Sequence, residues 1–349
     1  MSSHSCSEDP ETYSEDLCMV NKVNKLLGTR YPILSAPMGG VAGGELAAAV
    51  SNSGGAGLVG VSYGNEEFIA SELPIAARSR GVWGAGLVTF TFDKAPHLLD
   101  SVLSHRPPLV ALSFGNAAQT NKYVAAIQRE NLLAAVQVHD TDQAQEAAAA
   151  GADVIIAQGS EAGGHHKDRA TFPLIPAVAD ALNGQIPLVA AGGIADGRGL
   201  AAALALGADG VMIGTRFAAA AEALTSPSFT DSLINGHSRD LLDTRAFDII
   251  RSIPWPSQYT ARTLGNDFSR KWFGHEDELA DNAATLVDAW SQSVSGDDVT
   301  QRPLFAGENI DLITSVQPAA QIIESMIAQA CSVLDALGTT EFRDALPAH

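Results

Sequence analysis

The stretch PLVAAGGIADGRGLAAALALGADGVMIGTRF, residues 187–217, contains two short apolar runs separated by an alanine-rich segment. The apolar runs LVAA and GVMI are typical of parallel strands, because such strands are covered on both faces. The segment GLAAALALG, which begins at Gly199, has helical spacing and ends at a glycine, as helices often do. The stretch therefore predicts a strand, a helix and a second strand parallel to the first.

The same alternation continues over residues 31–217, with further alanine-rich helical segments beginning at Glu45 and Asp142. Repeated strand–helix units of this number fit a closed barrel better than an open doubly wound sheet, which has about five or six strands. We therefore predict the α/β class and a (β/α)8 TIM barrel. The predicted strands are ILSAP near Ile33, AGLVG near Leu58, VWGAGLV near Ala85, LVALSF near Leu112, LLAAVQV near Val136, VIIAQG near Ile156, PLVAAGG near Val189 and GVMIGTRF near Ile213.

The alternation stops after Phe217, and scattered aromatic and charged residues follow. Residues 218–307 are therefore predicted to form a smaller, mainly helical inserted domain that covers the active site. The segment QPAAQIIESMIAQACSVLDAL, residues 317–337, has apolar residues at helical spacing and could close the barrel as its eighth helix. We expect the barrel to comprise residues 26–217 and 308–345, and residues 1–25 to form a flexible acidic tail.

Composition limits the partners of this 349-residue chain. A net charge of −19 disfavours nucleic acid and anionic membranes, which would be repelled. The sequence has no apolar run long enough to span a bilayer, and its polar, acidic start does not resemble a signal peptide. Cys6, Cys18 and Cys331 lack the spacing of a disulfide framework or a metal site. We expect a cytoplasmic monomer or homodimer that acts on a small molecule.

Two glycine-containing loops follow the last two predicted strands. Gly192 and Gly193 end the first of these strands, and Gly214 and Thr215 end the second. Loops at this end of a barrel carry its active site, and glycines let backbone amides approach a phosphate closely. An isolated glycine pair more often forms only a tight turn, but its combination with the glycine of the next strand favours a phosphate site.

A third loop, AQGSEAGGHH, contains Gln158, the glycines Gly163 and Gly164, and two histidines. The glycines would permit the backbone to lie along a planar cofactor. His165 would then project toward a substrate, and its ordinary pKa of about 6.5 suits proton abstraction near neutral pH. We predict that His165 is catalytic and that His166 is a solvated neighbour. Adjacent histidines without a third ligand do not predict a zinc site, and no serine-hydrolase elbow is present.

The motifs together resemble the nitronate monooxygenase family, formerly called 2-nitropropane dioxygenases. The resemblance rests on YPILSAPMGGVAGGELAAAVSNSGGAGLVG (31–60), AQGSEAGGHH and AAGGIADGRGLAAALALGADGVMIGTRF (190–217), with support from VTFTFDK at Val88 and LSFGN at Leu112. Similarity continues more weakly through WPSQYTARTLGND and AGENIDLITSVQPAAQII. The resemblance implies an FMN-containing barrel that oxidises alkyl nitronates with O2 to a carbonyl compound and nitrite, without NADH, and it leaves the use of neutral nitroalkanes open.

By this resemblance, the histidine that closes the AGGH motif is the base near the flavin, His165. The family segment under the isoalloxazine falls on APM at residues 36–38, and the last phosphate-side segment includes Met212. The predicted FMN-binding residues are Ala36, Pro37, Met38, Gln158, Gly163, Gly164, Gly192, Gly193, Met212, Gly214 and Thr215. The chain departs from the family where HKD, residues 166–168, replaces a glycine or an arginine–glycine pair after the base, and where GLVTFTF lacks an asparagine that some members carry.

The motifs are also compatible with other functions. An FMN-dependent NAD(P)H enoyl reductase shares the EAGGH motif. A specialised flavin oxidase of secondary metabolism and a flavin-binding module without turnover are further alternatives. A barrel of the inosine monophosphate dehydrogenase kind needs a cysteine nucleophile on a loop, and no cysteine follows a predicted barrel strand.

Overall fold

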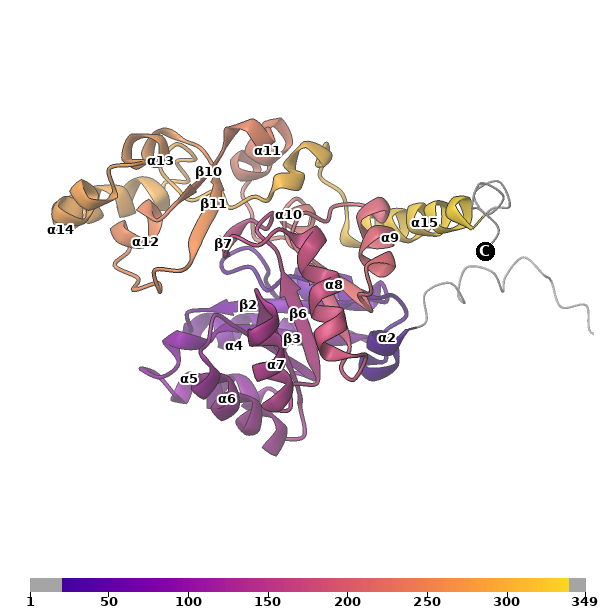
Figure 1. Cartoon of the computed structure of the whole chain (residues 1–349). Helices are drawn as coiled ribbons and strands as arrows, with labels where there is room; N and C mark the ends of the chain where they lie inside the picture. The colour runs from indigo at the N-terminus through magenta and orange to yellow at the C-terminus, as the bar shows by residue number, and fades with distance from the viewer. Residues whose placement is uncertain (1–20, 339–349) are drawn as a thin grey trace, which may run out of the picture.

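The computed structural model describes residues 21–338, in which eight parallel strands form a closed barrel with helices outside it (Figure 1). Each predicted strand is confirmed at its predicted place. The barrel closes where β9 pairs with β1, with Met212 opposite Leu34. In order around the barrel, the strands are β1 (Ile33–Ser35), β2 (Ala56–Ser62), β3 (Val82–Val88), β4 (Leu109–Ser113), β5 (Leu133–Val138), β6 (Val154–Gln158), β8 (Leu188–Ala191) and β9 (Gly210–Ile213).

A helix covers the barrel after each strand. The last of them, α15, packs against α9 and α3, as expected for the helix that completes the outer ring (Figure 1). Close helix–strand packing needs small residues: a Cβ added at Gly57 would lie 1.9 Å from the carbonyl oxygen of Ala47. The ring consists of α3 (Gly44–Asn52), α4 (Glu66–Ala76), α5 (His97–Ser104), α6 (Ala117–Arg129), α7 (Thr141–Ala149), α8 (Thr171–Leu182), α9 (Gly197–Ala205) and α15 (Ala319–Leu337).

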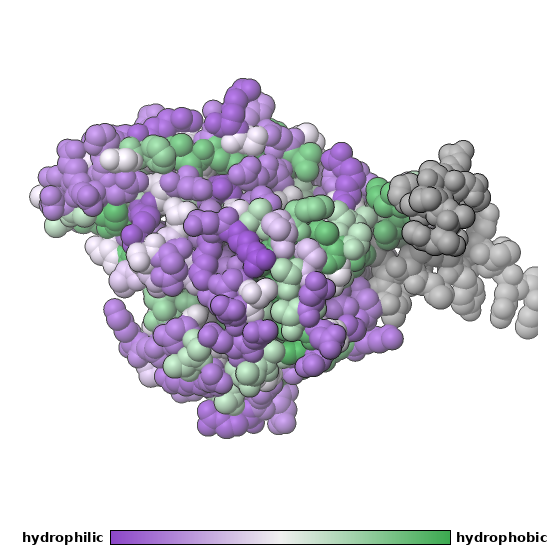
Figure 2. Space-filling model, viewed as in Figure 1, coloured by the Kyte–Doolittle hydropathy of each residue, from purple (hydrophilic) through white to green (hydrophobic). Residues whose placement is uncertain are grey.

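The barrel has two layers of apolar contacts. Small and branched side chains such as Leu34, Leu58 and Ile156 form a buried cluster from several strands. A larger cluster joins the strands to the helices, with Leu46 and Val50 of α3 among its buried members. Most of the face viewed in Figure 2 is hydrophilic, with smaller hydrophobic patches between the polar areas.

The chain between β9 and α15 lies over one end of the barrel (Figure 1). It contains helices, as predicted, but also two strands that the sequence did not indicate. β10 and β11 pair antiparallel, and β11 also pairs with β7 (Gly164–His166) from the loop after β6. The elements are α10 (Thr215–Ala218), α11 (Pro227–Asn235), β10 (Leu241–Thr244), α12 (Ala246–Ile250), β11 (Thr260–Leu264), α13 (Asp267–Trp272) and α14 (Glu276–Ser295).

The described residues do not reach either end of the chain. Residues 1–20 of the predicted tail and residues 339–345 of the predicted barrel lie outside the described residues. The remainder of the predicted tail runs into the short helix α2 (Lys22–Leu27), which is capped by the side chain of Asn21. Among the helices within residues 21–338, none is both long enough and apolar enough to cross a membrane.

Candidate active site

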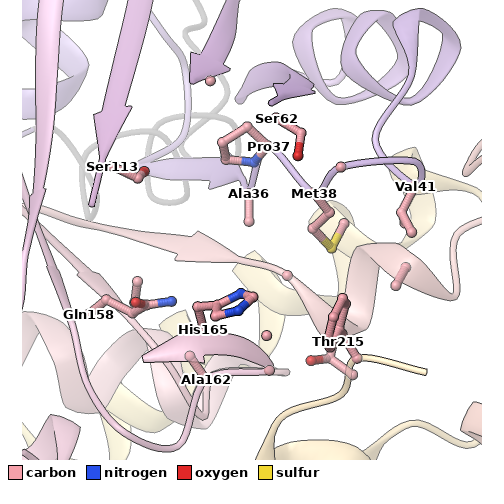
Figure 3. Close-up of a pocket in the computed structure, with 18 of the residues that line it drawn as sticks. Ala36, Pro37, Met38, Val41, Ser62, Ser113, Gln158, Ala162, His165 and Thr215 are labelled. Atoms are coloured by element: carbon pink, nitrogen blue, oxygen red, sulfur yellow. The ribbon is translucent and has the colours of Figure 1, made fainter. Parts of the chain in front are cut away.

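A cavity of about 300 Å³ lies where the loops after β1, β6, β8 and β9 meet (Figure 3). Every residue predicted to bind the cofactor or to act as the base lines this cavity. The structure thus brings together segments that are far apart in the chain. These residues are Ala36, Pro37, Met38, Gln158, Gly163, Gly164, His165, Gly192, Gly193, Met212, Gly214 and Thr215.

Residues 36–38 form one side of the cavity, opposite Gln158 and His165 in Figure 3. Glycines in the neighbouring strands make room for this segment. A Cβ at Gly86 of β3 would lie 2.1 Å from the ring of Pro37, and one at Gly60 of β2 would lie 2.3 Å from the carbonyl oxygen of Met38. The two glycines therefore let the segment fold closely over the ends of the strands.

We expect Gly86→Ala to displace Pro37 and thereby to disturb the cavity. Overpacking of this kind costs about 1–3 kcal/mol of unfolding free energy. Thermal unfolding and titration with the flavin expected from the sequence would measure the change, and we expect both the Tm and the flavin affinity to fall. Gly296→Ala is the matched control, because the nearest atom to a Cβ at Gly296 is 3.4 Å away. Equal changes of Tm and flavin affinity in Gly86→Ala and Gly296→Ala would contradict the view that Gly86 makes room for Pro37.

The glycine loops after β8 and β9 supply backbone donors at another part of the cavity. Gly192 and Gly193 have φ angles of 103° and 76°, which glycine adopts readily. Within residues 21–338, the N–H groups of Gly193 and Gly214 have no protein acceptor. Unpaired N–H groups that line a cavity fit an anionic group such as a phosphate.

His165 is held by a buried carboxylate. Its Nε2 lies 2.8 Å from Oδ2 of Asp248 on α12, and the two side chains are only 6% and 3% exposed. The other oxygen of Asp248 accepts a hydrogen bond of 3.1 Å from Arg251. A carboxylate accepts hydrogen bonds, so the proton of the neutral imidazole lies on Nε2. The Nδ1 of His165 has no hydrogen-bond partner among the described residues and keeps its lone pair.

An aromatic side chain fixes the plane of the His165 ring. Trp255 stacks on it with a centroid distance of 3.4 Å and an interplanar angle of 7°. The Trp255 indole N–H in turn donates to the hydroxyl of Tyr63 over 3.1 Å. Phe114 meets both rings edge-on. Indole faces also stabilise cations, so Trp255 and Asp248 both favour the protonated imidazole that forms after proton transfer.

Burial is the largest influence on the titration of His165. It lowers the pKa of His165 from its ordinary value, and the hydrogen bond and charge of Asp248 oppose this effect. His165 is therefore neutral at pH 7. With Asp248 negative and Arg251 positive, the three groups carry no net charge, and one positive charge appears when His165 takes a proton. An anion formed next to His165 would then be stabilised.

The direction of this pKa shift gives a pH dependence. Proton abstraction needs neutral His165, so the rate of a reaction that begins with proton transfer to His165 should fall as the pH drops through the pKa of His165. Because that pKa is lowered, we expect the midpoint of the acid limb below about 6.5. A pH series of initial rates would measure it, with the enzyme's stability checked at each pH. An acid limb centred above pH 7 would contradict the assignment.

The expectation that His166 is a solvated neighbour is wrong. His166 is only 2% exposed, and its Nε2 lies 3.3 Å from Asp243 on β10. The physical reason is the strand β7, in which successive side chains point to opposite faces. His165 lies on the cavity side, and His166 lies on the opposite side, where Arg262 also contacts Asp243.

Several residues of the site carried no recognisable signal in the sequence. Asp248, Arg251 and Trp255 come from the segment between β9 and α15, and no motif marks them. Trp255 belongs to the weakly similar stretch WPSQYTARTLGND, from which no role could be inferred. Within residues 21–338, no group of three or more His, Cys, Asp or Glu side chains is placed to hold a metal ion.

Comparison with known sequences supports the family resemblance that the motifs indicate. A family model described as nitronate monooxygenase matches residues 21–77 and 90–329. Nitronate monooxygenase npaC of Metarhizium robertsii is 35% identical over an alignment that covers 91% of this chain and 96% of that protein. A probable nitronate monooxygenase of Staphylococcus aureus is 27% identical, with coverage of 90% and 98%.

Comparison with solved structures finds chains of similar fold, including the following two. FabK from Thermotoga maritima matches with a TM-score of 0.80 and 30% identity, over 90% of this chain and 97% of that one. The nitroalkane oxidase from Streptomyces ansochromogenes matches with a TM-score of 0.74 and 26% identity, over 90% and 99% of the two chains.

Proposed function

Because this chain belongs to the nitronate monooxygenase family of oxidoreductases, which implies a flavin cofactor, we propose that it binds FMN in the cavity and oxidises alkyl nitronates with O2 to a carbonyl compound and nitrite. The observation that carries the proposal is the buried His165–Asp248 pair on the wall of a cavity lined by all the predicted cofactor-binding residues. The same pair supports the use of neutral nitroalkanes.

The residues present fit the proposed cofactor. The unpaired N–H groups of Gly193 and Gly214 suit the phosphate of FMN, and the closely packed segment 36–38 would lie against the isoalloxazine. On the opposite wall, Gly164 has a φ of 72°, and a Cβ added there would meet no atom within 4 Å, so the backbone could approach the ring at this residue. When bound, FMN supplies the electron acceptor and the route for electrons to O2. The chain supplies binding, orientation and the base.

In the proposed mechanism, Nδ1 of His165 removes the α-proton of a nitroalkane, whose carbon–hydrogen electron pair moves onto the nitro group to give the nitronate. Asp248 holds the opposite side of the ring, and Trp255 keeps it in plane. The anionic nitronate then lies beside the imidazolium of His165. Before the proton transfer, His165, Asp248 and Arg251 together carried no net charge. A nitronate supplied from solution needs no base, so this step affects only the neutral substrate.

The proposed function is tested with the purified, FMN-loaded protein. Oxygen uptake would be followed with propyl-2-nitronate in one cell, and NADH absorbance with a crotonyl thioester in another. We expect oxygen uptake and nitrite with the nitronate and no oxidation of NADH. Loss of NADH with the enoyl substrate and no reaction with the nitronate would contradict the proposal.

The similarity to FabK supports a second candidate, an FMN-dependent NAD(P)H enoyl reductase. The NADH arm of the same experiment decides between the two. A protein that binds FMN but reacts in neither arm would instead fit a specialised flavin oxidase of secondary metabolism.

A further inference from the structure

A chain of polar side chains continues from Gln158 into the barrel wall. The side-chain oxygen of Gln158 lies 2.8 Å from Nε2 of Gln137 and 2.9 Å from Nε2 of His139. The oxygen of Gln137 in turn accepts a hydrogen bond of 3.3 Å from the hydroxyl of Ser113. Ser113, Gln137 and Gln158 line the cavity, whereas His139 lies behind them and is only 2% exposed.

The hydrogen bonds determine which atom of His139 carries its proton. An amide oxygen only accepts, so both Gln137 and His139 must donate to Gln158, and His139 is protonated on Nε2. Burial lowers the pKa of His139 to about 4, so the ring is neutral near pH 7 and its Nδ1 is an acceptor. This Nδ1 is buried and has no partner within residues 21–338.

The opposite orientation of the Gln158 amide is less favourable. If its nitrogen faced His139, the histidine would have to accept at Nε2 and carry its proton on Nδ1. Among the described residues that N–H group would then be buried without an acceptor, and buried unpaired N–H groups are rarer than buried unpaired acceptors. Phe114 stacks on His139 at 5.7 Å, and Tyr259 packs against the ring at 5.3 Å, so the imidazole has little freedom to turn away.

We infer that Gln137 and His139 are positioning residues that hold the Gln158 amide with its Nε2 directed into the cavity, where it donates to a carbonyl oxygen or an unprotonated nitrogen of the isoalloxazine ring. Both donors occupy the amide oxygen, so only the nitrogen remains for a ligand. In Figure 3 the nitrogen of Gln158 points toward the space between Ala36 and His165. This inference rests on the proposal that the cavity binds a flavin.

A hydrogen-bond donor fixed at this position changes the relative stability of oxidised and reduced FMN. The acceptor atoms of the ring gain negative charge on reduction, and a donor placed beforehand stabilises that charge. The hydrogen bond from Gln158 should therefore favour reduced over oxidised FMN. Its loss should reduce this preference by about 3- to 10-fold, the contribution of one hydrogen bond.

The experiment measures the midpoint potential of bound FMN and the Kd of oxidised FMN, which together give the relative affinities of the two redox states. Gln158→Met removes the donor, and His139→Leu and Gln137→Met each remove one support. His139→Gln retains a donor near the position of Nε2 and should restore the wild-type preference. Gln128→Met is the matched control, because Gln128 bonds the carbonyl of Gly151 in an exposed position and does not line the cavity.

We expect a lower preference for reduced FMN in Gln158→Met, His139→Leu and Gln137→Met, and no change in His139→Gln or the control. Unchanged potentials in all variants would overturn the inference while leaving the proposed function intact. Equal shifts in His139→Leu and His139→Gln would assign His139 a packing role only. If the wild-type chain does not bind FMN, both proposals are overturned. Should His139→Leu fail to fold, Gln137→Met tests the same hydrogen-bond network from the cavity side.

Discussion

His165→Asn is expected to lower kcat/KM for neutral nitroethane by about 10²- to 10⁴-fold, the usual contribution of a general base. The variant removes Nδ1 as a proton acceptor and also the buried contact with Asp248. The rate with preformed ethylnitronate should fall far less, because that substrate has already lost its α-proton. Oxygen uptake with the two forms of the substrate, each added to freshly mixed enzyme, measures the difference.

The comparison of substrates is the internal control for His165→Asn. A misfolded or FMN-free variant would lose both activities, so FMN content and Tm are determined first. If the variant still oxidises the neutral nitroalkane at the wild-type rate, His165 is not the base. If both activities fall to the same extent, the histidine contributes to binding or folding instead of to proton transfer.

Asp248→Asn should lower kcat/KM for the neutral nitroalkane by about 10²-fold. In a serine protease, replacing the analogous aspartate by asparagine costs about 10⁴-fold, because the histidine is left in the wrong tautomer. Asparagine at position 248 can donate to Nε2 of His165 and so move the proton to Nδ1, the atom that must accept. The same change removes the partner of Arg251, so we also expect a lower Tm.

The pH profile distinguishes this role of Asp248 from a packing role. Asp248 raises the pKa of His165, so Asp248→Asn should move the acid limb of the remaining activity to lower pH. Asp243→Asn is the matched control, because Asp243 bonds His166 on the other face of β7. Comparable losses in the two variants, or an unmoved acid limb in Asp248→Asn, would contradict the positioning role.

The barrel was predictable because its signal is local. Each strand is a short apolar run next to a helix with its own periodicity. Loops after parallel strands meet at one end of a barrel, and this rule predicted the glycine loops and His165 at the cavity, whereas residues 36–38 and Met212 were predicted from the family resemblance.

The support of the base could not be predicted in the same way. Asp248 lies 83 residues from His165 in the chain, and a single aspartate in a five-residue helix has no distinctive spacing. β10 and β11 are also short, and the pairing of β10 with β11 and of β11 with β7 depends on contacts that only the folded chain provides. That pairing explains why His166 is buried although the sequence around it is polar.

The central claim is that a flavin in this cavity reacts directly with a nitronate. The most direct measurement is the absorbance of the FMN-loaded protein after anaerobic mixing with propyl-2-nitronate, followed by admission of O2. We predict that the oxidised flavin band decreases on mixing without NADH, and that it returns with O2 as nitrite is formed. A band that is unchanged by the nitronate but lost on addition of NADH would contradict the account.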